Sequence, residues 1–178
     1  KAKLAEVRDE IRRLDRREEG TERVLPIDTG RARHAVPRAG ERFLGRFDPK
    51  LQPESTVEYA PCGARIRDPH ILDESGRRVN VLVPGARYSY AYEVAFDEDA
   101  FRVRFGMMIK LVTGFELAGQ TTHPPRDGVE HVTAGSVAQV RFTFHARLVP
   151  GVYFLNAGVL GIRGDEAGYL HRVLDAAI

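Results

Sequence analysis

The chain has 178 residues, enough for one well-buried core and too few for two full domains joined by a linker. Its 43% hydrophobic and 29% charged residues are typical of a globular protein, which excludes the disordered and fibrous classes. No apolar run approaches the ~20 residues that cross a bilayer, and the first residues lack the apolar core of a signal peptide.

The positive charge is concentrated at the start of the chain. Residues 1–46 hold 13 Lys and Arg against 9 Asp and Glu, whereas residues 47–178 hold 14 against 16. Because the rest of the chain is nearly neutral, we do not expect nucleic acid as a partner. The single cysteine, Cys62, excludes an internal disulfide and is interpreted as a small strand residue.

Residues 1–19 predict a helical leader. Leu4, Val7, Ile11 and Leu14 follow one another at spacings of 3, 4 and 3, which places them on one apolar seam. A helix this short needs a partner, so it is either a linker helix or a dimerising seam. Residues 20–55 predict an extended basic connector, because prolines and glycines interrupt every periodic pattern there.

Residues 56–178 predict an all-β domain. Short strands are expected at 56–66, 77–83, 86–96, 101–111, 115–117, 136–148, 152–162 and 169–174, with turn signals between them and a long loop at 119–135. In the third of these strands one face is apolar and carries Tyr88, Tyr90, Tyr92, Val94 and Phe96. The apolar face of such strands must be covered by a second sheet, so we expect an antiparallel β-sandwich of immunoglobulin-like or jelly-roll type.

Residues 175–178 occupy a position where a further strand would begin. Either the chain continues there without order, or its terminal strand pairs with a neighbouring molecule, as in a domain swap.

Nothing in the sequence resembles a catalytic constellation. There is no phosphate-binding loop or nucleophile elbow, and no pair of carboxylates is marked out for acid–base work. Asp97, Glu98 and Asp99 predict a solvated turn, with calcium binding as the alternative. His123 and His131 share one loop, so an enzyme with a metal at this loop is kept as a further hypothesis. We therefore assign no catalytic and no metal-ligating residues.

The polar faces of the later strands are suited to carbohydrate. Arg104 on one strand could share a surface with polar residues of another strand, and further candidates lie opposite the apolar face of 152–162. Amides and guanidinium groups bond pairs of hydroxyls, and an aromatic ring packs on a pyranose. The alternative is an ordinary solvated sheet face. The candidate glycan-binding residues are Arg104, Gln139, Arg141, Thr143, His145, Phe154 and Asn156.

The order of several segments carries a family resemblance. They include Gly-Phe-Glu-Leu-Ala-Gly-Gln-Thr-Thr at 114–122 and Leu-Val-Pro-Gly-Val-Tyr-Phe-Leu-Asn-Ala-Gly-Val at 148–159, together with 71–79, 92–99, 105–110, 140–144 and 170–177. In this order, roughly residues 56–177 resemble the C-terminal domain of Wzt. Wzt is the nucleotide-binding subunit of bacterial ABC transporters that export O-antigen polysaccharide.

The resemblance implies a β-sandwich that binds the modified non-reducing end of the polysaccharide and couples chain termination to export. It also implies a homodimer formed by exchange of a terminal strand, and an upstream ATPase domain that binds ATP and Mg and contacts the membrane subunit. This fragment would then need no cofactor and would lie in the cytoplasm at the inner membrane. Arginines at the site would suit an anionic cap, such as a phosphate or an acidic sugar. The alternative function is a protein-interaction β-sandwich that assembles a complex without a glycan.

Overall fold

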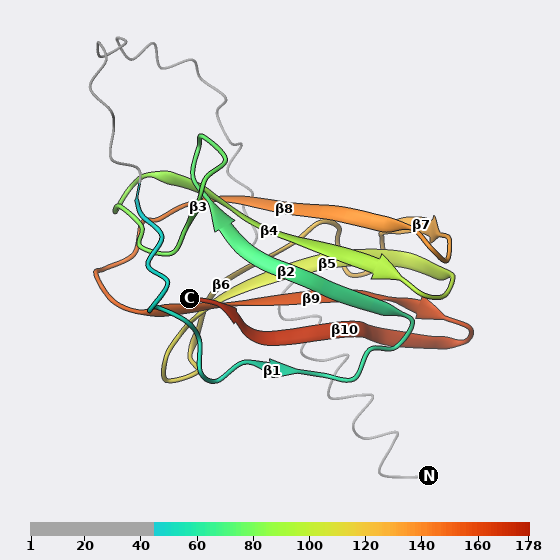
Figure 1. Ribbon diagram of the computed structural model, residues 1–178. Coiled ribbons are helices and arrows are strands. Elements are labelled where there is room, and N and C mark those ends of the chain that lie inside the picture. The colour runs from blue at the N-terminus through green and yellow to red at the C-terminus, as the bar shows by residue number, and fades with distance from the viewer. Residues whose placement is uncertain (1–44) are drawn as a thin grey trace, which may run out of the picture. The chain divides into compact units, whose positions relative to one another are not determined.

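The structure is a computed structural model that describes residues 45–178. The predicted helical leader and the connector as far as residue 44 lie outside the described residues. Every regular element in the described part is a strand, and the strands form two antiparallel sheets that face each other (Figure 1). The predicted all-β sandwich is therefore confirmed for this part of the chain.

The larger sheet has six strands. Its order is β1 (Val57–Glu58), β10 (Glu166–Ala177), β9 (Tyr153–Arg163), β5 (Ala100–Leu111) and β6 (Glu116–Thr121), with β7 (Val129–Val132) also paired to β5. The smaller sheet has the order β3 (Arg78–Val79), β2 (Ala64–Leu72), β4 (Arg87–Phe96) and β8 (Val137–His145).

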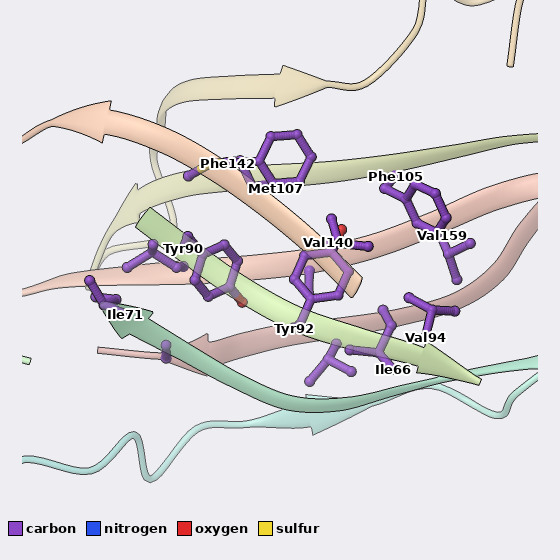
Figure 2. Close-up of a cluster of buried hydrophobic side chains, with 14 of the residues drawn as sticks. Ile66, Ile71, Tyr90, Tyr92, Val94, Phe105, Met107, Val140, Phe142 and Val159 are labelled. Carbon is purple, nitrogen blue, oxygen red and sulfur yellow. The ribbon is translucent and has the colours of Figure 1, made fainter. Parts of the chain in front are cut away.

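The core lies between the two sheets and follows the predicted alternation. All five apolar residues of the predicted face of β4 are buried, and they meet Phe105, Met107 and Val159 of the larger sheet (Figure 2). The Tyr92 hydroxyl crosses this core and lies 2.9 Å from the Gly106 carbonyl oxygen and 3.1 Å from that of Gly158. One side chain of β4 thus bonds to the backbones of both β5 and β9.

The first predicted strand, at 56–66, is divided in two. β1 covers only Val57 and Glu58 and pairs with β10, and β2 begins at Ala64 in the other sheet. Gly63 separates the two strands with a φ of 81°, a left-handed conformation that ends an extended segment. β2 then continues to Leu72, with a bulge at Asp68 that alternation alone does not reveal.

The last strand is longer than predicted. β10 runs to Ala177, so residues 175–177 complete a strand of the larger sheet. Exchange of a strand with a neighbouring molecule stays a prediction. The predicted loop at 119–135 also contains the end of β6 and the whole of β7.

The described end of the connector lies against the smaller sheet. The Arg46 N–H donates to the Val81 carbonyl at 3.0 Å. The Asn80 amide donates to the carbonyls of Asp48 and Leu51, and its oxygen accepts the Asp48 N–H. These bonds fix residues 46–51 on the sandwich.

Candidate functional site

The predicted site residues lie on two different faces of the sandwich. Gln139, Arg141, Thr143 and His145 alternate with the buried Val140 and Phe142 on β8, so they point outward from the smaller sheet. Arg104, Phe154 and Asn156 lie on β5 and β9 of the larger sheet, again opposite core residues. The prediction that Arg104 shares a surface with the β8 residues is wrong, because the two outer faces point in opposite directions.

The outer face of the smaller sheet, which we call the β2–β4–β8 face, is built from cross-strand rows. In one row Ala91 of β4 lies between His70 of β2 and Arg141 of β8. In the next row Glu93 lies between Arg67 and Gln139. Directly opposed side chains on one face are close enough to act on the same ligand. The rows therefore combine two guanidinium groups, an amide, an imidazole and a carboxylate.

The middle strand of this face carries short side chains. Ser89, Ala91 and Ala95 are outward positions of β4, with Glu93 between the two alanines, while the flanking strands carry Arg67 and Arg141. Short side chains between longer ones form a shallow floor with polar walls. Ala91 and Ala95 are buried although they are on the outward face, which shows that their neighbours partly enclose the floor.

Two cations on this face lack a compensating acid. Arg65 lies 3.5 Å from Glu58, and Arg78 pairs with Asp68. Glu93 accepts a hydrogen bond from the Gln139 amide at 2.7 Å. Among the described residues, Arg67 and Arg141 form no ion pair, so both guanidinium groups keep their donors free for an anionic or hydroxyl-rich ligand.

Three useful members of this face were missed from sequence. Arg67, His70 and Ala91 complete the rows around Arg141. The predicted first strand ended at residue 66, so Arg67 and His70 fell outside it. The Asp68 bulge also shifts the register between them, and neither effect leaves a signal in the alternation.

On the larger sheet, several polar residues near the end of β10 bond to one another. Asn156 is only 4% exposed, and its side-chain oxygen accepts the Asp175 N–H at 2.9 Å. Lys110 Nζ lies 2.6 Å from Asp175 Oδ1, and the Ser55 hydroxyl donates to Asp175 Oδ2 at 2.6 Å. Lys110 also lies 5.9 Å from the centre of the Phe154 ring. We call Ser55, Lys110, Asn156 and Asp175 the β10 network.

The β10 network surrounds Asp175, which has an unusual backbone conformation. Asp175 has a φ of 50°, in the left-handed region that side chains other than glycine rarely adopt. The network bonds at both the main chain and the carboxylate of this residue, so it stabilises a bulge near the end of β10. Lys110 and Asp175 are therefore occupied, so they are weaker candidates for ligand binding than the free guanidinium groups of the β2–β4–β8 face. The buried Asn156 Nδ2, by contrast, has no hydrogen-bond partner among the described residues.

An apolar cavity of about 460 Å³ opens near the turn between β8 and β9. Its only polar lining side chains in the described part of the chain are Asn80 and Tyr153. The Asn80 amide is bonded to the connector, and the Tyr153 hydroxyl donates to the Val149 carbonyl at 2.6 Å. A sugar would find no free partner there, so this cavity does not compete with the β2–β4–β8 face.

The loop that holds His131 and that the sequence analysis kept as a possible metal site lies within residues 45–178. His131 lies 3.1 Å from Asp99 and stacks on Phe101, and no group of three or more His, Cys, Asp or Glu residues in this range could hold a metal ion. The hydrogen bonds to Asp99 from the Ala134 backbone and from His131 lower the pKa of that carboxyl group. This range likewise has no helix long and apolar enough to cross a membrane.

Comparisons with known proteins agree with the fold. A sequence model of the Wzt C-terminal domain family matches residues 56–178. The crystal structure of the C-terminal domain of Wzt has 24% sequence identity and a TM-score of 0.59, covering 74% of this chain and 77% of that chain. This likeness shows a shared fold.

Two further results are weaker. Spo0M, a sporulation control protein from Bacillus subtilis, has 16% identity and a TM-score of 0.33, covering 61% of this chain and 47% of that chain. A likeness of this size supports no inference. No curated protein matches the sequence.

Proposed function

Because the chain belongs to the Wzt C-terminal domain family, we propose that it binds the modified end of an exported polysaccharide through its β2–β4–β8 face. Family membership supports an association with an ABC exporter. The proposed role is to recognise a finished O-antigen chain at its non-reducing terminus and so couple termination to export.

The observation that carries the proposal is the pair of free guanidinium groups beside the short-chain floor. Arg67 and Arg141 flank β4 on opposite sides, next to the rows of Ala91 and Glu93. A sugar ring can lie on the floor, while the arginines bond an anionic cap through charge-assisted hydrogen bonds. Gln139, Thr143 and His145 add groups that bond hydroxyls at the β8 side.

The remaining parts of the proposal concern partners. An ATPase domain upstream would bind ATP and Mg and would contact the membrane subunit of the exporter. The domain would then work in the cytoplasm, at the inner face of the membrane, as a homodimer. Exchange of a terminal strand is one way in which the two copies could associate.

A titration tests the glycan proposal. The full chain is titrated calorimetrically with purified bacterial O-polysaccharides, each with and without its terminal modification. Arg141→Ala should weaken binding of a capped polysaccharide by about 10–100-fold, since a hydrogen bond to a charged group contributes ~1.5–3 kcal/mol. Arg126→Ala, which removes the same charge from the exposed loop between β6 and β7, should change little.

The titration also separates the proposal from its alternatives. Equal affinity of the two variants would exclude the β2–β4–β8 face. Binding that survives removal of the cap would exclude recognition of the terminus. A chain that binds no O-polysaccharide at all would favour the alternative of a protein-interaction sandwich.

A further inference from the structure

The core of the sandwich is open at one end. The apolar cavity of about 460 Å³ extends from the β8–β9 turn to Ile109 and Leu155 of the larger sheet. Leu82, Phe144 and Leu148 pack against the core there but are only partly buried. Protein cores are normally closely packed, so an open apolar cavity of this size is a candidate site for an apolar ligand.

Three segments of the chain form the mouth of this cavity. They are residues 50–53, residues 80–86 and the β8–β9 turn at 146–152, and Figure 1 shows all three at the same end of the sandwich. The three segments contain no Asp or Glu. Their two cations, Lys50 and Arg147, are exposed and form no ion pair with any described residue. The mouth therefore carries positive charge without an acid of its own.

The tip of the β8–β9 turn is apolar. Val149 is 76% exposed and Val152 is 47% exposed, and the turn projects from the end of the sandwich (Figure 1). Exposed apolar side chains beside an apolar opening mark an interaction surface, either for a protein or for a membrane. A stable protein interface buries about 800 Å² of each partner, far more than two valines on a projecting turn offer. A membrane surface, in contrast, accepts a small apolar tip.

We propose that this end of the sandwich binds an anionic phospholipid at a membrane surface. One acyl chain enters the cavity, whose polar lining groups among the described residues are already bonded. Lys50 and Arg147 bond the phosphate, and Val149 and Val152 enter the boundary between headgroups and acyl chains. A single acyl chain gives only marginal membrane binding, so the cations and the apolar tip supply the remaining affinity.

The first test is flotation of the full chain with lipid vesicles. The chain should bind vesicles of phosphatidylcholine mixed with phosphatidylglycerol about tenfold more tightly than pure phosphatidylcholine, because only the mixture offers anionic headgroups. Lys50→Gln with Arg147→Gln should weaken binding to the anionic vesicles by about 10–30-fold, since each cation near such a surface raises the affinity roughly fivefold. Arg102→Gln with Arg126→Gln removes the same charge at exposed positions of β5 and of the β6–β7 loop, and should change little.

A second pair of variants tests the apolar tip. Val149→Ser with Val152→Ser should weaken binding to the anionic vesicles by about tenfold, because the tip then gains less from leaving water. Val129→Ser with Val137→Ser makes the same change at exposed positions of β7 and β8 and should have little effect. Circular dichroism on each variant separates loss of binding from loss of folding.

Tryptophan fluorescence shows whether an acyl chain enters the cavity. The chain has no Trp of its own, so Phe144→Trp reports on the cavity wall and Val152→Trp on the tip. Phosphatidylglycerol brominated on its acyl chains should quench both, whereas Val137→Trp at the opposite end of β8 should not be quenched. If Phe144→Trp does not fold, Leu148→Trp on the same wall replaces it.

Three results would overturn the proposal. The full chain could fail to bind anionic vesicles, which would leave the mouth to a protein partner. A control pair could lose as much binding as its matched variant, which would place the lipid contact elsewhere. Quenching of Val152→Trp without quenching at the cavity wall would show that no acyl chain enters the cavity. Neither test involves a glycan, so the outcome is independent of the proposed function.

Discussion

The two outer faces of the sandwich carry similar polar residues and use them differently. On the β2–β4–β8 face, Arg67 and Arg141 are exposed and form no ion pair with any described residue. On the larger sheet, Lys110 and Asp175 are nearly buried and bond to each other at 2.6 Å. The two arginines therefore keep their donors for a ligand, whereas Lys110 and Asp175 have already used their charges on each other.

The difference arises from what lies beside each strand. The central strand of the smaller sheet has Ser89, Ala91 and Ala95 on its outer face, which leave space above them. The outer face of β9 has Asn156, which is buried and bonds to the backbone of Asp175 at the bulge of β10. An outward position on a strand thus predicts exposure only where the neighbouring side chains are short.

The largest effect that distinguishes the faces is expected from Asp175→Ala. This change leaves Lys110 as a nearly buried charge without its partner and should lower the free energy of unfolding by about 3–5 kcal/mol. Urea unfolding measures the loss. Glycan binding on the opposite face should be unaffected in the fraction that remains folded.

A second variant shows whether the loss comes from the unpaired charge. Adding Lys110→Met to Asp175→Ala removes that charge, so part of the lost stability should return. If Asp175→Ala unfolds at the same urea concentration as the unmodified chain, the β10 network does not stabilise the larger sheet. If the second change restores nothing, the cost arises from the backbone bonds of residue 175.

A smaller effect on stability is expected from His171, which connects the two sheets. His171 of β10 accepts the Ile66 N–H of β2 at its Nδ1, at 2.9 Å, and its Nε2 lies 3.3 Å from Glu58 Oε1. Burial lowers the pKa of His171 below its usual 6.5, although the charge of Glu58 acts in the opposite direction; nearby Arg65 lowers it further.

The sign of the pH dependence follows from this lowered pKa. As the pH falls through about 6.5, the unfolded chain binds a proton that folded His171 does not, so the free energy of unfolding should decrease. Urea midpoints at pH 7 and pH 5 measure the change. His171→Gln should reduce the difference between the two midpoints, and an unchanged difference would show that other groups cause it.

The sequence predicted the inner faces of the strands well. Alternation identified the buried residues of β4 because a two-residue period follows directly from strand geometry. It could not show that Arg104 and Arg141 belong to different sheets, since the period is the same in both. The assignment of a strand to a sheet depends on long-range pairing, such as β5 with β9 and β4 with β8.

Local irregularities limited the prediction of the site. Gly63 and the bulge at Asp68 moved the true β2 strand beyond its predicted end, so Arg67 and His70 were missed. Asn156 was correctly placed on the outward face of its strand but is buried, because the fold brings Asp175 beside it. The two residues are far apart in the sequence, and nothing local to either one indicates this contact.

The smallest expected effect concerns the one acid in the rows of the β2–β4–β8 face. Glu93 lies beside Arg67 and repels an anionic ligand, so Glu93→Gln should strengthen binding of a polysaccharide with an anionic cap by roughly 2–5-fold, the size of a partly exposed charge interaction. Glu166→Gln on β10 is the control of equal charge and should have no effect. The gain should shrink at high salt, because salt screens exposed charges. A gain of equal size for the uncapped polysaccharide would mean that the face recognises hydroxyls, and that Arg67 and Arg141 do not select an anion.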